Sequence, residues 1–220
     1  MSADWERLTP LLWEAAGQTA YMVLITLLVG GFFGLALGLG LYLTRPGNLL
    51  QHRFVFAVLN LAVNIVRPIP FIIFLVALGP LTRAVIGSTI GIEAFTFAMC
   101  IMATFVFARL VEQNLVSIDP GVVEAARAMG ASPLRIVRTV LVPEALAPLV
   151  LGYTFLFVGV LDMSAIGGYL GAGGLGDFAI VQGYRQYDWA VTAVVVVIIV
   201  LIVQAVQWLG NGLARRALRR

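Results

Sequence analysis

Long apolar runs separated by short polar segments are the dominant pattern of the chain. A helix needs about 20 mainly apolar residues to cross the ~30 Å hydrocarbon core of a membrane. Hydrophobic residues make up 61% of the 220 and charged residues 11%, whereas soluble domains carry about 25% charged residues. The pattern predicts an all-α integral membrane protein of one domain with five transmembrane helices. These helices are expected near residues 19–43, 54–78, 93–115, 146–167 and 189–209.

The arginines predict the orientation of these helices. Every basic residue is arginine, and basic residues concentrate on the cytoplasmic side of membrane proteins. Ten arginines lie in the segments 44–53, 109–145 and 214–220, three lie in the outer segments, and Arg67 lies within a span. We therefore predict a multi-pass protein of the cell (inner) membrane, with a basic cytoplasmic tail at 214–220. The net charge of +3 is a topology signal and does not indicate nucleic acid binding.

The N-terminal segment 1–14 is predicted to be extracytoplasmic, because it carries three acidic residues and precedes the first span. It lacks the basic start of a cleaved signal peptide, and the apolar run that follows is long enough to span the membrane. Insertion is therefore expected to rely on uncleaved helices.

The segment 119–143 is too charged to lie in lipid but carries helix signals. Asp119-Pro120 is typical of an N-cap followed by proline in the first turn, and Ser132-Pro133 repeats the pattern. Gly130 between them is typical of a helix stop. The segment is predicted to form two short helices with a turn at Gly130, lying on the inner membrane surface.

This segment resembles the EAA loop of ABC importer permeases. Glu124, Ala125, Ala126, Gly130 and Pro143 match that motif at its spacing, although valines stand at two positions where isoleucine and leucine are usual. An amphipathic helix resting on lipid is the alternative, but such a helix favours basic edges and bulky apolar residues. The resemblance implies a coupling loop that docks into a partner ATPase. Its contact residues are expected to be Glu124, Ala125, Ala126, Arg127, Met129, Gly130 and Pro143.

Further stretches resemble the methionine-uptake branch of these permeases. They are residues 44–47, 64–73, 82–87, 127–131 and 171–176. The resemblance implies a type I ABC importer permease fold over 15–213, a permease homodimer, two ATP-binding subunits that carry ATP and magnesium, and an extracytoplasmic substrate-binding lipoprotein. Methionine, as both enantiomers, is the implied substrate, and alternating access coupled to ATP hydrolysis is the implied mechanism. Relatives with similar permeases carry other small amino acids or their derivatives.

Two charges inside predicted spans are candidates for the transport path. Arg67 lies near the middle of the second span beside Pro70, and a charge at this depth costs ~2.5–3.5 kcal/mol or more unless it is paired or wetted. Asp162 is interpreted as the one acidic residue well within a span, a departure from the family, with Met163 and Ser164 beside it. Each charge is expected either to line a pore or gate or to be a structural tie. For Asp162 the alternatives are pairing with Arg67, pairing with a symmetry mate, and reaching outer water.

Glycines and aromatic residues mark the outer part of the chain. The stretch 171–176 lacks the lysine and serine or threonine of a nucleotide loop, so it is interpreted as a re-entrant turn packed at a dimer axis. Gly30, Gly34 and Gly38 predict close helix packing. An outer rim is predicted to dock the binding protein, or to form an interfacial aromatic belt. It consists of Tyr184, Arg185, Tyr187 and Asp188.

The sequence contains no constellation typical of an enzyme. One cysteine and one histidine exclude an internal disulfide and a histidine-pair metal site, and no catalytic triad or nucleotide motif is present. We expect a non-catalytic chain without a cofactor of its own. An ATP-independent secondary transporter or channel is the alternative, but such transporters commonly show inverted repeats and several intramembrane carboxylates.

Overall fold

The computed structural model describes residues 4–218, and every regular element in that range is helical. The first helix, α1 (Trp5–Thr44), begins directly after Asp4, whose carboxylate accepts a hydrogen bond from the Arg7 amide. Residues 5–14 of the segment predicted to be extracytoplasmic thus belong to α1. A capped helix continues beyond the apolar stretch, and Leu8 is buried at its start.

Three further helices confirm the predicted spans. They are α5 (Ile92–Val116), α8 (Val142–Ile166) and α10 (Trp189–Leu218). Helix α10 continues through the described part of the basic tail and carries Arg215 and Arg216 in its last turn, where basic side chains favour the helix dipole. Arg219 and Arg220, which also contributed to the predicted orientation, lie outside the described residues.

The second predicted span is broken. Helix α2 (Arg53–Val66) and helix α3 (Phe71–Ala77) meet at an angle of 111°, and α4 (Gly79–Ile86) follows. Pro68 and Pro70 lack the amide that a continuous helix needs, and they disfavour helical backbone in the residue before them. The sequence predicts an interruption of the second span, 54–78, at residues 67–70, and the break between α2 and α3 confirms it. By length and composition, four helices can cross a membrane, and the bent pair makes a fifth if it forms one span.

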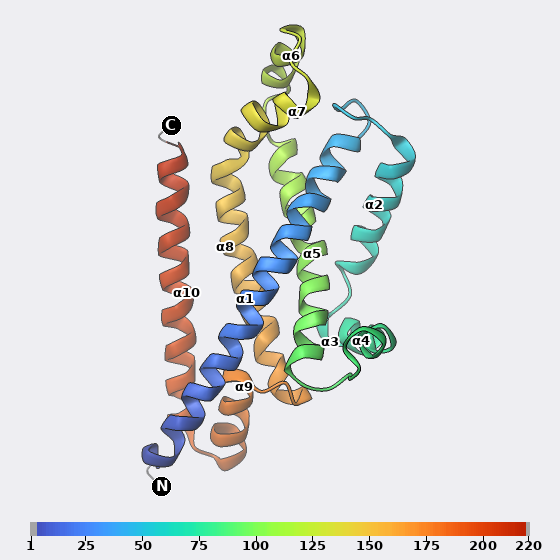
Figure 1. The fold of residues 1–220 in the computed structure, drawn as a ribbon. Coiled ribbons are helices and arrows are strands. Elements are labelled where there is room, and N and C mark those ends of the chain that lie inside the picture. The colour runs from blue at the N-terminus through green and yellow to red at the C-terminus, as the bar shows by residue number, and fades with distance from the viewer. Residues whose placement is uncertain (1–3, 219–220) are drawn as a thin grey trace.

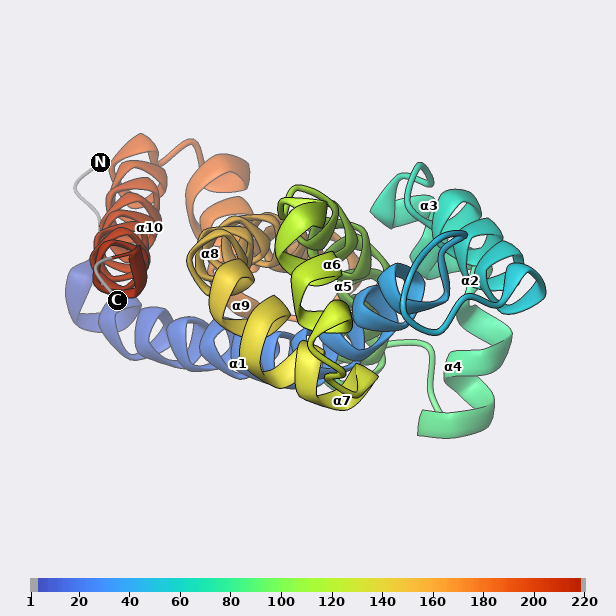
Figure 2. The same ribbon diagram turned by 90° about the horizontal axis from the view of Figure 1, so that it is seen from above.

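The spans stand in a row, with α1 laid obliquely across them (Figures 1 and 2). The row runs from α10 through α8 and α5 to α2, and α1 contacts α5 more extensively than any other helix. A Cβ atom added at Gly30 would lie 2.8 Å from the Cβ of Ala103, and one at Gly34 would lie 2.8 Å from that of Phe107. The predicted close packing through Gly30, Gly34 and Gly38 is therefore confirmed, and its partner is α5.

The connecting elements divide between the two ends of the molecule. Figure 1 places α6 (Pro120–Ala128) and α7 (Pro133–Ile136) at the same end as the C-terminus. The N-terminal end of α1 lies at the opposite end, together with α3, α4 and α9 (Gly174–Phe178). Short helical turns complete the chain: η1 (Val137–Leu141), η2 (Gly167–Leu170), η3 (Ala179–Gly183) and η4 (Tyr184–Gln186).

Candidate functional site: an exposed loop and polar groups within the spans

The loop 119–143 has the caps that its sequence predicts. The Asp119 carboxylate accepts a hydrogen bond from the Gly121 amide at 2.8 Å, and the Ser132 hydroxyl accepts one from the Arg135 amide at 3.4 Å. Between these caps, Gly130 turns the chain with a φ of +78°. The prediction of two helices joined by a turn at Gly130 is confirmed.

The second of these helices is not a separate surface helix, which corrects the prediction. Helix α7 runs through η1, a turn of π-helix, directly into α8. Pro143 in the first turn of α8 has no amide to donate to the Thr139 carbonyl four residues earlier, and a wider turn relieves the clash between its ring and that carbonyl. The loop and α8 therefore form one continuous helical path.

Helix α6 has one side against its own chain and one side free. Val123 and Ala126, three residues apart, are buried in the main apolar core. Ala125 lies on the exposed side with Glu124, and Met129 is 81% exposed. The prediction that Ala125 and Ala126 both face a partner is therefore wrong for Ala126, because its position on the helix turns it inward.

The charged residues of α6 border a small cleft. Glu124 and Arg127 are both exposed, and within residues 4–218 no ion pair joins them. The cleft has a volume of about 230 Å³ and separates α6 from the end of α1, where it is lined by Tyr42 and Arg45. Both α6 charges are therefore free to meet groups of another molecule.

The predicted pore residues separate into exposed and buried ones. Arg67 follows the last turn of α2 with its side chain exposed, Pro70 precedes α3, and Asp162 is exposed on α8. Among the described residues, no ion pair links Arg67 with Asp162. Met163 and Ser164 are 9% and 1% exposed, and the Ser164 hydroxyl donates to the Leu161 carbonyl at 2.7 Å. Both therefore belong to the core of this chain, and their candidacy as lining residues is corrected.

A polar cluster that the sequence analysis missed joins α2 to α5. Arg109 was counted among the cytoplasmic arginines, and it lies on α5 and donates to Glu112, Asn60 and Asn64. Glu112, four residues before the end of α5, is only 3% exposed. The sequence contains a spacing signal for this cluster. Arg109 and Glu112 are three residues apart, and Asn60 and Asn64 are four residues apart, so each pair lies on one face of its helix.

The glycine-rich turn at the opposite end packs within its own chain. The Gln18 side-chain oxygen accepts from the Gly174 amide at 2.7 Å, and the Thr19 hydroxyl accepts from the Leu175 amide at 2.8 Å. A Cβ atom at Gly176 would overlap the Ala165 carbonyl. These contacts bring the turn onto α1 and α8, whereas the sequence analysis had assigned its packing to a dimer axis.

The predicted outer rim follows this turn. Tyr184 and Tyr187 are 59% and 81% exposed, and Arg185 is exposed between them. Asp188 has a different role, because its carboxylate accepts from the amides of Ala190 and Val191 at 3.1 and 3.4 Å and caps α10. Three of the four rim residues are therefore free for contact with another molecule.

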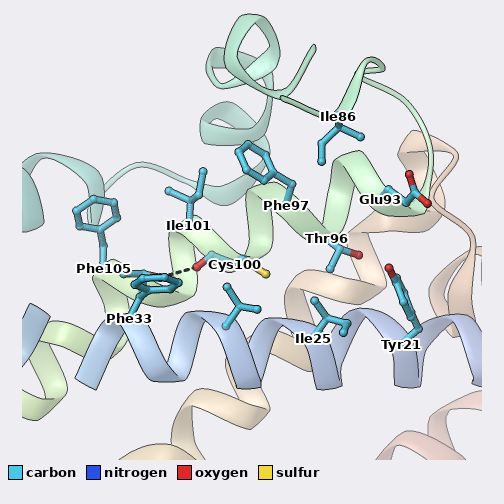
Figure 3. Close-up of a pocket in the computed structure, with 12 residues that line it drawn as sticks. Tyr21, Ile25, Phe33, Ile86, Glu93, Thr96, Phe97, Cys100, Ile101 and Phe105 are labelled. Carbon is cyan, nitrogen blue, oxygen red and sulfur yellow. Dashed lines mark hydrogen bonds between the residues drawn. The ribbon is translucent and has the colours of Figure 1, made fainter. Parts of the chain in front are cut away.

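A groove of about 590 Å³ lies between α1 and α5, beneath Ile86 of α4 (Figure 3). Tyr21, Thr96 and Glu93 gather toward one end, and Phe33 and Phe105 lie toward the other. The lining is mostly apolar and contains none of the residues predicted for the coupling loop, the pore or the rim. The groove therefore adds no polar site to those described above.

The molecule combines helices that can cross a membrane with a structured loop that is exposed at one end, outside the spans. This combination defines a polytopic membrane subunit. The model of the family described as binding-protein-dependent transport system inner membrane component matches residues 30–219. This chain belongs to that family.

Individual relatives are similar along almost the whole chain. The chain is 41% identical over 215 residues to the probable D-methionine transport system permease protein MetI of Vibrio cholerae, a match that covers 97% of this chain and 96% of that protein. It is 40% identical over 200 residues to the methionine import system permease protein MetP of Bacillus subtilis, covering 91% and 90%.

Solved structures share the fold. A chain of the MetNI methionine ABC transporter in an inward-facing conformation matches with a TM-score of 0.92 and 39% identity, over 99% of both chains. A chain of an amino acid ABC transporter with histidines matches with a TM-score of 0.80 over 98% of this chain and 100% of that one, and at 21% identity it shows the fold alone. The predicted type I ABC importer permease fold is confirmed.

Proposed function

We propose that this chain is the membrane-spanning permease subunit of an ATP-driven importer of methionine. The observation that carries the proposal is helix α6, whose free side presents Ala125 and Met129 on a membrane subunit similar to methionine permeases. Small and flexible apolar side chains suit close contact with a protein groove. The substrate assignment rests on the relatives named above, which are methionine permeases.

The coupling step follows from how α6 is attached. Val123 and Ala126 fix α6 to the core, so α6 does not move independently of its own chain. Beyond Gly130, α7 and η1 lead without a break into α8. A displacement of α6 by an ATPase that closes on ATP therefore reaches α8 directly, and Glu124 and Arg127 supply charges for the contact.

The remaining components are part of the same proposal. Two copies of this chain form the path, two ATP-binding subunits carry ATP and magnesium at the cytoplasmic end, and an extracytoplasmic substrate-binding protein docks at the rim. The chain itself is non-catalytic. Its α6 end and the C-terminal end of α10 face the cytoplasm. The segment between α9 and α10, which carries the exposed Tyr184, Arg185 and Tyr187, faces outward at the opposite end.

The proposed path follows the broken second span. Arg67 and Pro70 are exposed at the break between α2 and α3, and Asp162 is exposed on α8. Charges at membrane depth face a neighbouring protein or water rather than lipid. We therefore assign these surfaces to the interior of the dimer, where they border the route of the substrate.

Reconstitution tests the proposal. The chain, its partner ATPase and its binding protein are placed in liposomes, and uptake of labelled D- and L-methionine is measured with ATP or a non-hydrolysable analogue. Uptake is expected only with hydrolysable ATP and all components present. Equal uptake by liposomes that contain the chain without the ATPase would instead favour an ATP-independent transporter and contradict the proposal.

A further inference from the structure

Helix α2 is attached to the rest of the molecule mainly through one small apolar cluster. Val63 is its only buried residue, and together with half-buried Phe56 and Leu59 it packs against Leu41 of α1 and Ala108 of α5. In lipid, apolar surface alone does not drive helices together, so close packing and polar contacts determine how they associate. No glycine of α2 offers close approach, because the helix contains none. Polar contacts therefore add to this limited apolar packing in holding α2 against α5.

Those contacts converge on one side chain. The Nη2 atom of Arg109 donates to the Oδ1 atom of Asn60 at 3.1 Å and also to the Oδ1 atom of Asn64. Asn60 and Asn64 are one helical turn apart, a rise of about 6 Å along α2. A single guanidinium thus holds two acceptors that succeed each other along the helix axis.

Arg109 itself is held in place from α5. Its Nη1 atom donates to Glu112, which lies three residues further along the same helix and is 3% exposed. The other Glu112 oxygen lies 3.9 Å from Arg45 at the end of α1. The charge pair therefore belongs to the fixed α1–α5 unit, and the two asparagines belong to α2.

We propose that Arg109, Asn60 and Asn64 form a two-position latch that lets α2 shift along α5 during transport. When α2 shifts toward the α6 end, Asn64 stays opposite Arg109 and Asn60 leaves; the opposite shift keeps Asn60. In each position the guanidinium retains one neutral acceptor besides Glu112, so neither position leaves the charge unpaired. The inference rests on the proposed function, which requires the spans to alternate between two arrangements. Arg109 acts here as a positioning residue.

The latch predicts opposite effects from two equivalent substitutions. Asn60→Asp and Asn64→Asp preserve the shape of the side chain and strengthen its bond to Arg109, because a carboxylate adds Coulomb attraction to the guanidinium that a neutral amide oxygen lacks. Each is expected to change the ratio of the two α2 positions by about fivefold, in opposite directions. Asn60→Leu should act in the same direction as Asn64→Asp, because both favour the bond at position 64. If the asparagines only stabilise the contact between α2 and α5, the two substitutions are not expected to shift the ratio in opposite directions.

Distances between spin labels measure the ratio. In a Cys100→Ala background, labels are placed on α2 at Leu61→Cys and on α5 at Val116→Cys, both of which are exposed. The labelled chain is diluted into an excess of unlabelled chain, assembled with the ATPase, and measured by electron–electron double resonance without nucleotide and with trapped ATP. Asn211→Asp, an exposed asparagine of α10, is the matched control and should leave the ratio unchanged.

Two outcomes overturn the latch. In the first, Asn60→Asp and Asn64→Asp shift the ratio in the same direction. In the second, neither variant differs from the Asn211→Asp control. Uptake by the unsubstituted complex in the same preparation separates this failure from that of the proposed function. A complex that transports without opposite shifts contradicts the latch alone, whereas one that hydrolyses ATP without uptake contradicts the proposed function.

Discussion

The two glycine turns at opposite ends of the molecule use the same residue for different purposes. At the α6 end, a Cβ atom at Gly130 would meet nothing within 4 Å, and the residue serves only to give a φ of +78°. At the α9 end, Cβ atoms at Gly173 and Gly176 would collide with Gln18 and with the Ala165 carbonyl. The α6 turn needs glycine only for its backbone conformation, whereas the α9 turn needs it for space at Gly176 and for both space and a positive φ at Gly173.

The neighbouring helices differ in the same way. Leu175 and Phe178 of α9 are 1% and 4% exposed and pack with Leu8 of α1. Met129, beside the other turn, is 81% exposed. The comparison teaches that the α9 turn closes the fold onto itself, whereas the α6 turn leaves a surface for another protein.

The largest effect is expected at the closed turn. Gly176→Ala introduces a methyl group into the Ala165 carbonyl, and overpacking of this kind costs about 1–3 kcal/mol or more. The substituted chain should unfold at a clearly lower temperature in detergent, measured by fluorescence-detected size exclusion after heating. Gly159→Ala on α8 is the control, because its Cβ would meet nothing within 4 Å. Equal melting of the two variants would remove the claim that the α9 turn is sterically closed.

A smaller loss is expected when the closed turn loses one hydrogen bond. Thr19→Val keeps the shape of the side chain but removes the acceptor of the buried Leu175 amide, at a cost of about 1–3 kcal/mol. The same heating assay should show destabilisation. Thr9→Val, at an exposed threonine of α1 that bonds only to the Trp5 carbonyl, should have little effect. If both valine variants melt alike, the tie between α1 and α9 does not contribute to stability.

The smallest effect is expected at the open turn. Gly130→Ala meets no steric obstacle, so its cost is that of a positive φ, about 1–2 kcal/mol. The free chain can relax this exposed turn and the docked chain cannot, so we expect ATPase affinity to fall roughly tenfold, in proportion to that cost, with little change in thermal stability. Gly87→Ala, which has a φ of +87° and free space at the end of α4, on the opposite side of the molecule, is the matched control. An equal loss of affinity in both variants would deny α6 a specific role.

The sequence predicted the spans because apolar length is a strong signal, and it predicted the loop because Asp119, Gly130 and Ser132 have local roles. It did not predict features that depend on contacts between neighbouring helices. The polar contacts of Arg109 were not predicted, because its partners Asn60 and Asn64 lie on another helix, α2.

Local sequence patterns also do not show which side of a short helix is turned toward the core. Ala125 and Ala126 are identical in type, and only the packing of Val123 shows which alanine is turned inward. The start of α1 was missed for another reason. A helix continues past the membrane surface when its cap and its packing support it, as Asp4 and Leu8 do here, and hydropathy does not report that extension.

The affinity of the partner ATPase for this chain in lipid nanodiscs tests the central claim most directly. Met129→Asp combined with Ala125→Arg places charges on the free side of α6 without touching Ala126, and it is compared with Tyr187→Asp at the other end. Met129 and Tyr187 are both 81% exposed, so the two substitutions differ in place rather than in exposure. We predict an affinity loss of about 100-fold for the α6 variant, the scale of an interface hot spot, and no loss for Tyr187→Asp. Undiminished binding by the α6 variant would contradict the account.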